Sequence, residues 1–422
     1  MRRLVLGLAF ALVSVPKLAN AEPERVDGPF TLAQAIARVQ AVGFDVRVAR
    51  GDADIASAEA QSARASLRPQ IGISANALDA NEPQLGMPVA RQAFGAVSMS
   101  VPLLTASGRL SAVASATRAE AARTSVDSVA NDAVFATVQA YRRAQVGEAV
   151  LEARHVTVRE QQVHLRLDEL KVASGKSPRY ILARDRASLA VALQNEEDAA
   201  SERDQSRNDL AALLDLNVDS QLAVEPLAQL SFVESREDAE ARALHRRPSL
   251  IAATQRVAAA ELSLRAARSA YTPTLQFSAQ TYNGTSVPNL GRSGGQVQVT
   301  ATVPLLDGGT RSAEASRAYG ELARTTALRD QIKLSVRRDV VNAYRELLAA
   351  QRNLSTARAG QIDAEEQLRI ARLRESVGKG TELELLTALS VAASAREMVA
   401  RSVARYDVAI AAIHHAAGDQ TI

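Results

Sequence analysis

The chain has 422 residues, enough for two or three ordinary domains, yet only 3% of them are aromatic and none is tryptophan or cysteine. The absence of cysteine excludes a disulfide framework, a thiolate metal site and a lipid-modified N-terminal cysteine. The formal charge of +3 becomes zero, with 47 basic and 47 acidic residues, once Arg2, Arg3 and Lys17 leave with a signal segment. Such a balanced chain lacks the electrostatic footprint of a nucleic-acid-binding protein.

Residues 1–21 have the pattern of a cleaved secretory signal. Two arginines precede an apolar run from Leu4 to Val15, and the small residues of Ala19-Asn20-Ala21 suit a cleavage site. The run is shorter than the roughly 20 residues that a membrane-spanning helix needs. We therefore expect an exported chain whose mature form begins near Glu22.

The mature chain contains an internal duplication, which sets the architecture for every local motif. Val-Pro-Leu-Leu at 101–104 recurs at 303–306, and three further anchors keep an offset of 202 to 204 residues. We expect repeats at 22–234 and 235–418, with a short tail at 419–422. The further anchors are Pro69 with Pro273, Val138–Arg142 with Val341–Arg345, and Gly175-Lys176 with Gly378-Lys379.

Each repeat is expected to contain a helix and then two strands, at 70–78 and 92–103 and again at 274–283 and 295–305. Apolar Leu275, Phe277 and Ala279 alternate with polar neighbours, which is the period of a strand with one apolar face. A soluble hairpin packed on a helix would show the same alternation. Two such hairpins at matching places, each beside a very long helix, favour strands with lipid on one face and water on the other.

Two very long helices are expected at 108–174 and 310–377, because neither stretch contains proline and glycine is rare in both. At 1.5 Å per residue, each would be about 100 Å long. Return helices follow at 179–215 and 381–417, and a linker is expected at 216–234. The last helix has a coiled-coil seam, with Val399, Val403 and Tyr406 at heptad spacing.

The helices of each repeat are separated by a tight turn rich in glycine. The turn residues are Gly175, Lys176, Ser177 and Pro178 in the first repeat and Gly378, Lys379, Gly380 and Thr381 in the second.

Four strands cannot close a membrane barrel, and lipid does not tolerate an open sheet edge. Because a water-filled barrel needs more than eight strands, three chains with twelve strands form the smallest assembly that encloses a pore. The sequence therefore predicts an oligomer.

The order of these elements resembles the outer-membrane efflux protein family, the TolC family of export ducts. The resemblance covers about residues 30–418 and rests on the duplication, the two Val-Pro-Leu-Leu segments and the turn Ser376-Val377-Gly378-x-x-Thr381. It implies a mostly α fold with a small β part, in which a homotrimer forms a twelve-stranded barrel in the cell outer membrane. This barrel is continuous with a periplasmic α-helical barrel, belted by an equatorial layer at about 216–246 and both chain ends.

The resemblance also implies partners and a mode of action. A periplasmic adaptor and an inner-membrane pump would deliver cargo, which the duct conducts passively, with no catalysis and no cofactor. The two hairpin turns would form the periplasmic tip that meets the adaptor. Lys176 and Lys379 would face it there, or would simply make an exposed turn soluble.

Family positions at the periplasmic constriction, matched from Gly378, fall on Glu384 and Thr387, and their first-repeat counterparts are Ile181 and Arg184. Three copies of Glu384 would form a ring that attracts cations, although a solvated glutamate on a helix face is the simpler interpretation. Arg184 could pair with an acid of a neighbouring helix and hold the entrance shut. The residues that form a latch in the second repeat of relatives match Glu375 and Gly380 here, so that latch is missing.

No catalytic or metal site is predicted, because the five histidines lack metal-binding spacing and no nucleophile stands with a base. Two other classes remain open. A periplasmic adaptor would have one long helical hairpin and no duplication, and a structural coiled coil would lack the paired strands.

Overall fold

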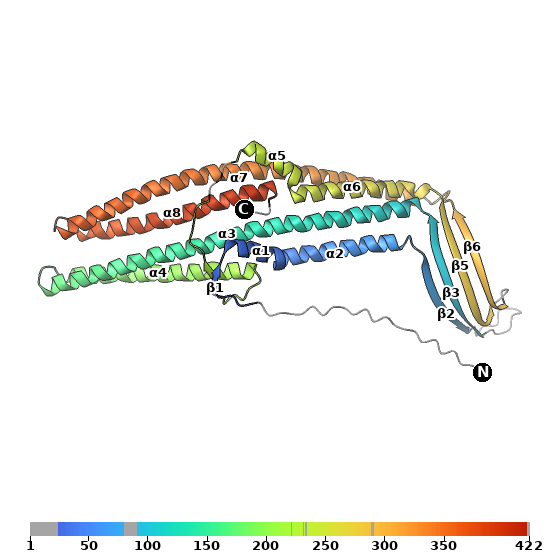
Figure 1. Ribbon diagram of the computed structural model, residues 1–422, viewed down its shortest axis with the longest axis horizontal. Helices are drawn as coiled ribbons and strands as arrows, with labels where there is room; N and C mark the ends of the chain where they lie inside the picture. Colours follow the sequence, from blue (N-terminus) through green and yellow to red (C-terminus); the bar gives the residue numbers. More distant parts are fainter. Residues whose placement is uncertain are drawn as a thin grey trace.

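The computed structural model describes residues 24–79, 91–220, 222–230, 232, 234–287 and 291–419. The expected signal at 1–21 lies outside the described residues. The molecule is elongated, with long helices side by side and a four-stranded sheet at one end (Figure 1). This mostly helical fold with a small sheet confirms the expected class for a single chain. None of the helices in the described part combines the length and the apolar character that crossing a membrane requires.

Two helical hairpins run away from the sheet and end together at the opposite tip (Figure 1). The first pairs α3 (Ala106–Ala173) with α4 (Tyr180–Leu213), and the second pairs α7 (Thr310–Ser376) with α8 (Glu382–Ala417). With 68 residues, α3 is about 100 Å long. The expected bounds, 108–174 and 310–377 for the long helices, lie within two residues of these.

Shorter helices line the half of the molecule nearest the sheet. In the first repeat, α1 (Leu32–Val42) and α2 (Phe44–Ala65) pack on α3, and Thr31 begins α1 with a capping box. In the second repeat, α5 (Arg236–Arg246) packs on α7 and α8, and α6 (Pro248–Arg268) packs on both α3 and α7. A 3₁₀ turn, η1 (Ser269–Tyr271), connects α6 to the sheet.

The sheet is antiparallel, in the order β2-β3-β5-β6. Its strands are β2 (Gln70–Asp79), β3 (Arg91–Leu104), β5 (Thr274–Val287) and β6 (Gly291–Thr302). Neither β2 nor β6 has a partner strand on its outer side among the described residues. The sheet of one chain is therefore open at both edges.

The register separates an apolar face of the sheet from a polar one. Residues paired across all four strands form an apolar row of Ile71, Met99, Ala279 and Val297. The row one residue away consists of Gln70, Ser100, Ser278 and Gln298. Because successive side chains point to opposite sides of a strand, the two rows lie on opposite faces.

A second, two-stranded sheet lies at the middle of the molecule, where β1 (Gly28–Phe30) pairs in parallel with β4 (Leu222–Val224). The residue pattern alone predicts only a linker at 216–234, because three-residue strands carry no readable alternation. Tyr141 of α3 fixes this sheet by donating a hydrogen bond to the Phe30 carbonyl (2.8 Å) and accepting one from the Glu225 amide (3.0 Å).

Tyr344, the counterpart of Tyr141 in the second repeat, has an equivalent role. Its hydroxyl donates to the Ser235 carbonyl at 2.8 Å, where α5 begins. The two repeats thus use matching tyrosines to fix their own connecting segments to a long helix.

Tyr141→Phe is expected to lower the thermal stability of the purified protein more than Tyr344→Phe. Tyr141 is fully buried, so losing its hydroxyl removes the partner of the buried Phe30 carbonyl and of the part-buried Glu225 amide, at a cost of about 1–3 kcal/mol. Tyr344 is only partly buried and leaves a carbonyl that water can reach. Far-ultraviolet circular dichroism during heating measures both variants. Equal melting temperatures would contradict the assigned role of Tyr141.

The two repeats are joined by a buried ion pair between α3 and α8. Arg142 lies 3.2 Å from Asp407, which also accepts a hydrogen bond from the Leu230 amide at 2.9 Å. Burial raises the pKa of Asp407 and outweighs the opposing effects of the Leu230 amide and the Arg142 guanidinium. This contact holds the two hairpins together at the middle of the molecule.

Candidate functional site

Both hairpin turns use a left-handed glycine to end the preceding helix. Gly175 has φ +72° and Gly378 has φ +71°, a region that side chains with a Cβ rarely adopt. Backbone amides then bond back to the last turn of each helix, from Lys176 to the Lys171 carbonyl (2.8 Å) and from Lys379 to the Arg374 carbonyl (2.9 Å). The turn sequences therefore bring the beginnings of α4 and α8 close to the ends of α3 and α7.

The structure places every expected tip residue, at 175–178 and 378–381, in these two turns, with both lysines exposed. Glu384 closes a capping box with Thr381 at the start of α8 and lies 3.8 Å from Arg374. Thr387 is exposed one turn further along, and both line a surface hollow between α7 and α8. Ile181 is partly buried in the first turn of α4.

Arg184 reaches out of α4 to α8, where its guanidinium pairs with Glu382. It also lies 3.4 Å from its neighbour Asp185. The sequence predicts an acidic partner for Arg184 on a neighbouring helix without indicating which acid, and in the structure that acid is Glu382.

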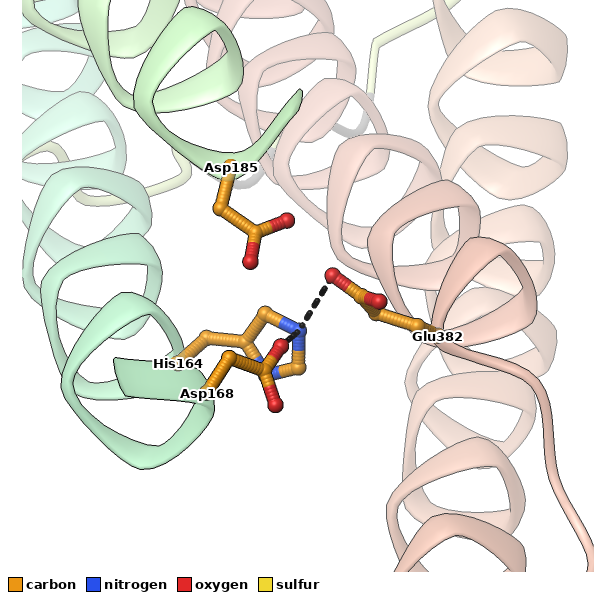
Figure 2. A group of neighbouring side chains, drawn as sticks. All are labelled: His164, Asp168, Asp185 and Glu382. Carbon is orange, nitrogen blue, oxygen red and sulfur yellow. Dashed lines mark ion pairs between the residues drawn. The ribbon is translucent and has the colours of Figure 1, made fainter. Parts of the chain in front are cut away.

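Figure 2 shows a group of four side chains drawn from three helices, three of them buried and the fourth, Glu382, partly buried. Arg184 contacts two of the four, Asp185 and Glu382. His164 and Asp168 are one helical turn apart on α3, Asp185 projects from α4, and Glu382 is the first residue of α8. The His164 Nε2 atom lies 3.3 Å from Asp168 and 3.2 Å from Glu382. Figure 2 shows the four side chains facing one another across the space between the hairpins.

The fourth helix, α7, contributes Glu375, which pairs with Lys171 of α3 beside the group. The Lys171 ammonium lies 2.8 Å from Asp168 and 3.4 Å from Glu375 of α7. Its pKa is raised, first by the hydrogen bond to Asp168. All four helices of the two hairpins therefore meet in one charged cluster near the tip.

The contact between the two central carboxyls, together with Arg184, separates their pKa values. Desolvation, together with the adjacent Glu382 carboxylate, raises the pKa of Asp185 to about 7. Burial also acts to raise the pKa of Glu382, but contacts with Asp185 and Arg184 outweigh it and hold that pKa at about 2. Near neutral pH, Glu382 is therefore the ionised partner of Arg184, and Asp185 is the group that takes up a proton.

Sequence reasoning missed three of the four residues of this group entirely and considered His164 only for its spacing from other histidines. The His164–Asp168 spacing of four residues was a usable signal, because both side chains must lie on one helix face. Asp185 and Glu382 gave no signal, since their proximity arises from packing between two hairpins far apart in sequence.

The fold and the duplication both have counterparts among known proteins. A family model described as "Outer membrane efflux protein" matches residues 35–215 and again residues 241–419. Protein CyaE of Bordetella pertussis is 27% identical over 376 residues, which is 86% of this chain and 78% of that protein. The two matched segments correspond to the two repeats.

Solved outer-membrane channels share the whole architecture. The CmeC channel of Campylobacter jejuni matches with a TM-score of 0.79 and 16% identity, covering 93% of this chain and 87% of that one. The MtrE channel of Neisseria gonorrhoeae, solved in an open state, matches with a TM-score of 0.79 and 20% identity, covering 92% and 89%.

The family match decides between the classes that the sequence left open. An adaptor with one hairpin or a scaffold without paired strands would not match the model in both halves of the chain. Because the match covers most of the chain, this protein belongs to the outer membrane efflux protein family, and it is an outer-membrane export channel that extends into the periplasm.

Proposed function

We propose that three copies of this chain form one continuous duct, a twelve-stranded barrel in the outer membrane joined to a periplasmic tube of helices. The observation that carries the proposal is the open sheet. Strands β2 and β6 are unpaired on their outer sides among the described residues, and unpaired backbone groups are too costly to leave in lipid. Strand addition between neighbouring copies satisfies both edges.

The exposed side chains support the same assembly. Ile73 of β2 and Val297 of β6 are 76% and 70% exposed, on strands long enough to cross the hydrocarbon layer. Along the hairpins, large apolar side chains also remain exposed in the single chain, which suits helices that pack against further helices. These side chains include Val163, Leu170, Val191, Ile362, Leu373 and Leu383.

The duct carries out no reaction, and its tip is both a docking surface and a constriction. The turns at 175–178 and 378–381 meet a periplasmic adaptor, which connects the duct to an inner-membrane pump. The Arg184–Glu382 pair holds the two hairpins together there. Glu384, close to the same tip, gives the opening a negative charge on each copy, and Ile181 and Thr387 flank it.

Docking at the tip can be tested with single cysteines, because the chain has none of its own. A photo-crosslinker attached to Lys379→Cys in intact cells is expected to trap a periplasmic adaptor, identified by mass spectrometry. The matched control is Lys333→Cys, since Lys333 is also exposed on the second hairpin but lies far from the turn. Equal capture from both positions, or none from Lys379→Cys in protein recovered from the outer membrane, would contradict docking at the tip.

A further inference from the structure

The four-residue group near the tip has the composition and geometry of a metal-ligand set. One potential ligand atom from each of His164, Asp168, Asp185 and Glu382 lies within 4.8 Å of the others. The first three residues are only 4%, 2% and 2% exposed. Figure 2 shows that they and Glu382 converge on one small region between the helices.

Each carboxylate of the group uses one oxygen for a cation and leaves the other without a hydrogen bond. Asp168 contacts Lys171 through Oδ1, Asp185 contacts Arg184 through Oδ1, and Glu382 contacts Arg184 through Oε2. The second oxygen of each, together with His164 Nε2, is buried and makes no hydrogen bond of good geometry, and Nε2 lies 3.3 Å from Asp168 Oδ2 and 3.2 Å from Glu382 Oε1. A single Nε2 proton cannot satisfy three carboxylate oxygens, and a buried polar atom left unpaired costs about 1–3 kcal/mol, so this convergence needs a physical explanation.

We propose that these four residues bind one divalent first-row transition ion of the zinc type. One imidazole nitrogen and three carboxylate oxygens suit zinc and its neighbours, whereas magnesium and calcium prefer six or more oxygen ligands. Any two ligand atoms around a tetrahedral zinc ion lie roughly 3.3 Å apart, because each bond to the ion is about 2 Å long. Small side-chain rotations would therefore contract the present group onto an ion.

The charge around the group matches a divalent ion. Among the described residues, the four carboxylates Asp168, Asp185, Glu375 and Glu382, when ionised, face two cationic side chains, Lys171 and Arg184. Two negative charges are left over, which an ion of charge +2 balances. Neither cation has to leave, because each contacts a carboxylate oxygen other than the proposed ligand atom.

A carboxylate also lies on the outer side of the histidine, close by but beyond hydrogen-bonding distance. His164 Nδ1 lies 3.9 Å from the Glu375 carboxylate. Metal-bound histidines commonly direct their second nitrogen toward such a carboxylate, which orients the ring. Because the ligands come from α3, α4 and α8 of one chain, the ion would connect both hairpins, and its binding does not depend on trimer formation.

Metal content tests the proposal directly. The tag-free, metal-free, full-length mature protein in detergent is dialysed against zinc, and bound metal is measured by mass spectrometry, with magnesium as the control ion. We expect one zinc per chain and no stoichiometric magnesium. His164→Gln and Glu382→Gln are expected to weaken zinc binding by at least about 100-fold, since even outer-shell changes cost 10- to 100-fold.

The matched control is His155→Gln, which removes a histidine from the same helix but from a pair with Glu196 outside the group. This variant should bind zinc as the wild type does. Cobalt provides a second readout, because a four-coordinate site gives intense visible absorption that His164→Gln should abolish. Circular dichroism verifies that each variant is folded. If one of the ligand variants does not fold, Asp168→Asn is used in its place.

Two results would overturn the proposal. One is a folded wild-type protein without saturable zinc binding, which would leave the group as an ion-pair network only. The other is undiminished binding in folded His164→Gln and Glu382→Gln, which would place the zinc elsewhere.

Discussion

Val297→Arg is expected to prevent assembly of the barrel in the outer membrane, whereas Gln298→Arg, one residue further along β6, is expected to be tolerated. Val297 lies in the apolar row of the sheet and Gln298 in the polar row. Arginine on a lipid-facing strand position costs about 2–4 kcal/mol near the middle of the bilayer. Three copies incur this cost together in a trimer.

The measurement is the amount of each variant in the outer-membrane fraction and the fraction that migrates as a heat-sensitive trimer on a denaturing gel. Gln298→Arg is the matched control, because it adds the same charge to the same strand. Ile73→Arg in β2 should fail like Val297→Arg, since Ile73 lies on the same apolar face at the opposite edge. If Val297→Arg assembled normally, or if both β6 variants failed alike, the apolar face would not be the lipid face.

The parts of the fold that were readable in the sequence are those with a long, regular pattern. Leu275, Phe277 and Ala279 predicted a strand because a single alternation extends along β5. The absence of proline over more than sixty residues predicted α7. The pairing of β1 with β4 was missed, because a three-residue strand cannot show a period and its partner lies almost 200 residues away.

The charged cluster illustrates the same limit at the candidate site. Matching the two repeats singled out Arg184 and suggested an acidic partner on another helix. The identity of that partner depends on how two hairpins pack, which no pattern within α4 or α8 encodes. Glu384, the acid that the sequence did single out, instead caps its own helix and lies near Arg374.

Glu382→Ala is expected to increase the conductance of single channels in planar bilayers. Removing this carboxylate takes away the partner of Arg184 on α8 and the closer of the two contacts that His164 makes with the second hairpin. Because Arg184 is 37% exposed, water screens part of the interaction. A coupling of about 1–3 kcal/mol would change the ratio of open to closed tips by about 5- to 150-fold.

Glu366→Ala is the matched control. It removes the same charge from α7, but Glu366 is exposed and, within the described part of the chain, pairs only with Arg369 of its own helix. Recording both variants with a chelator present separates the ion pair from any bound metal. Higher conductance in Glu382→Ala alone would identify the Arg184–Glu382 pair as a restraint on the opening. Equal conductance in wild type and Glu382→Ala would mean that the cluster stabilises the hairpins without controlling the opening, and that another part of the duct limits flow.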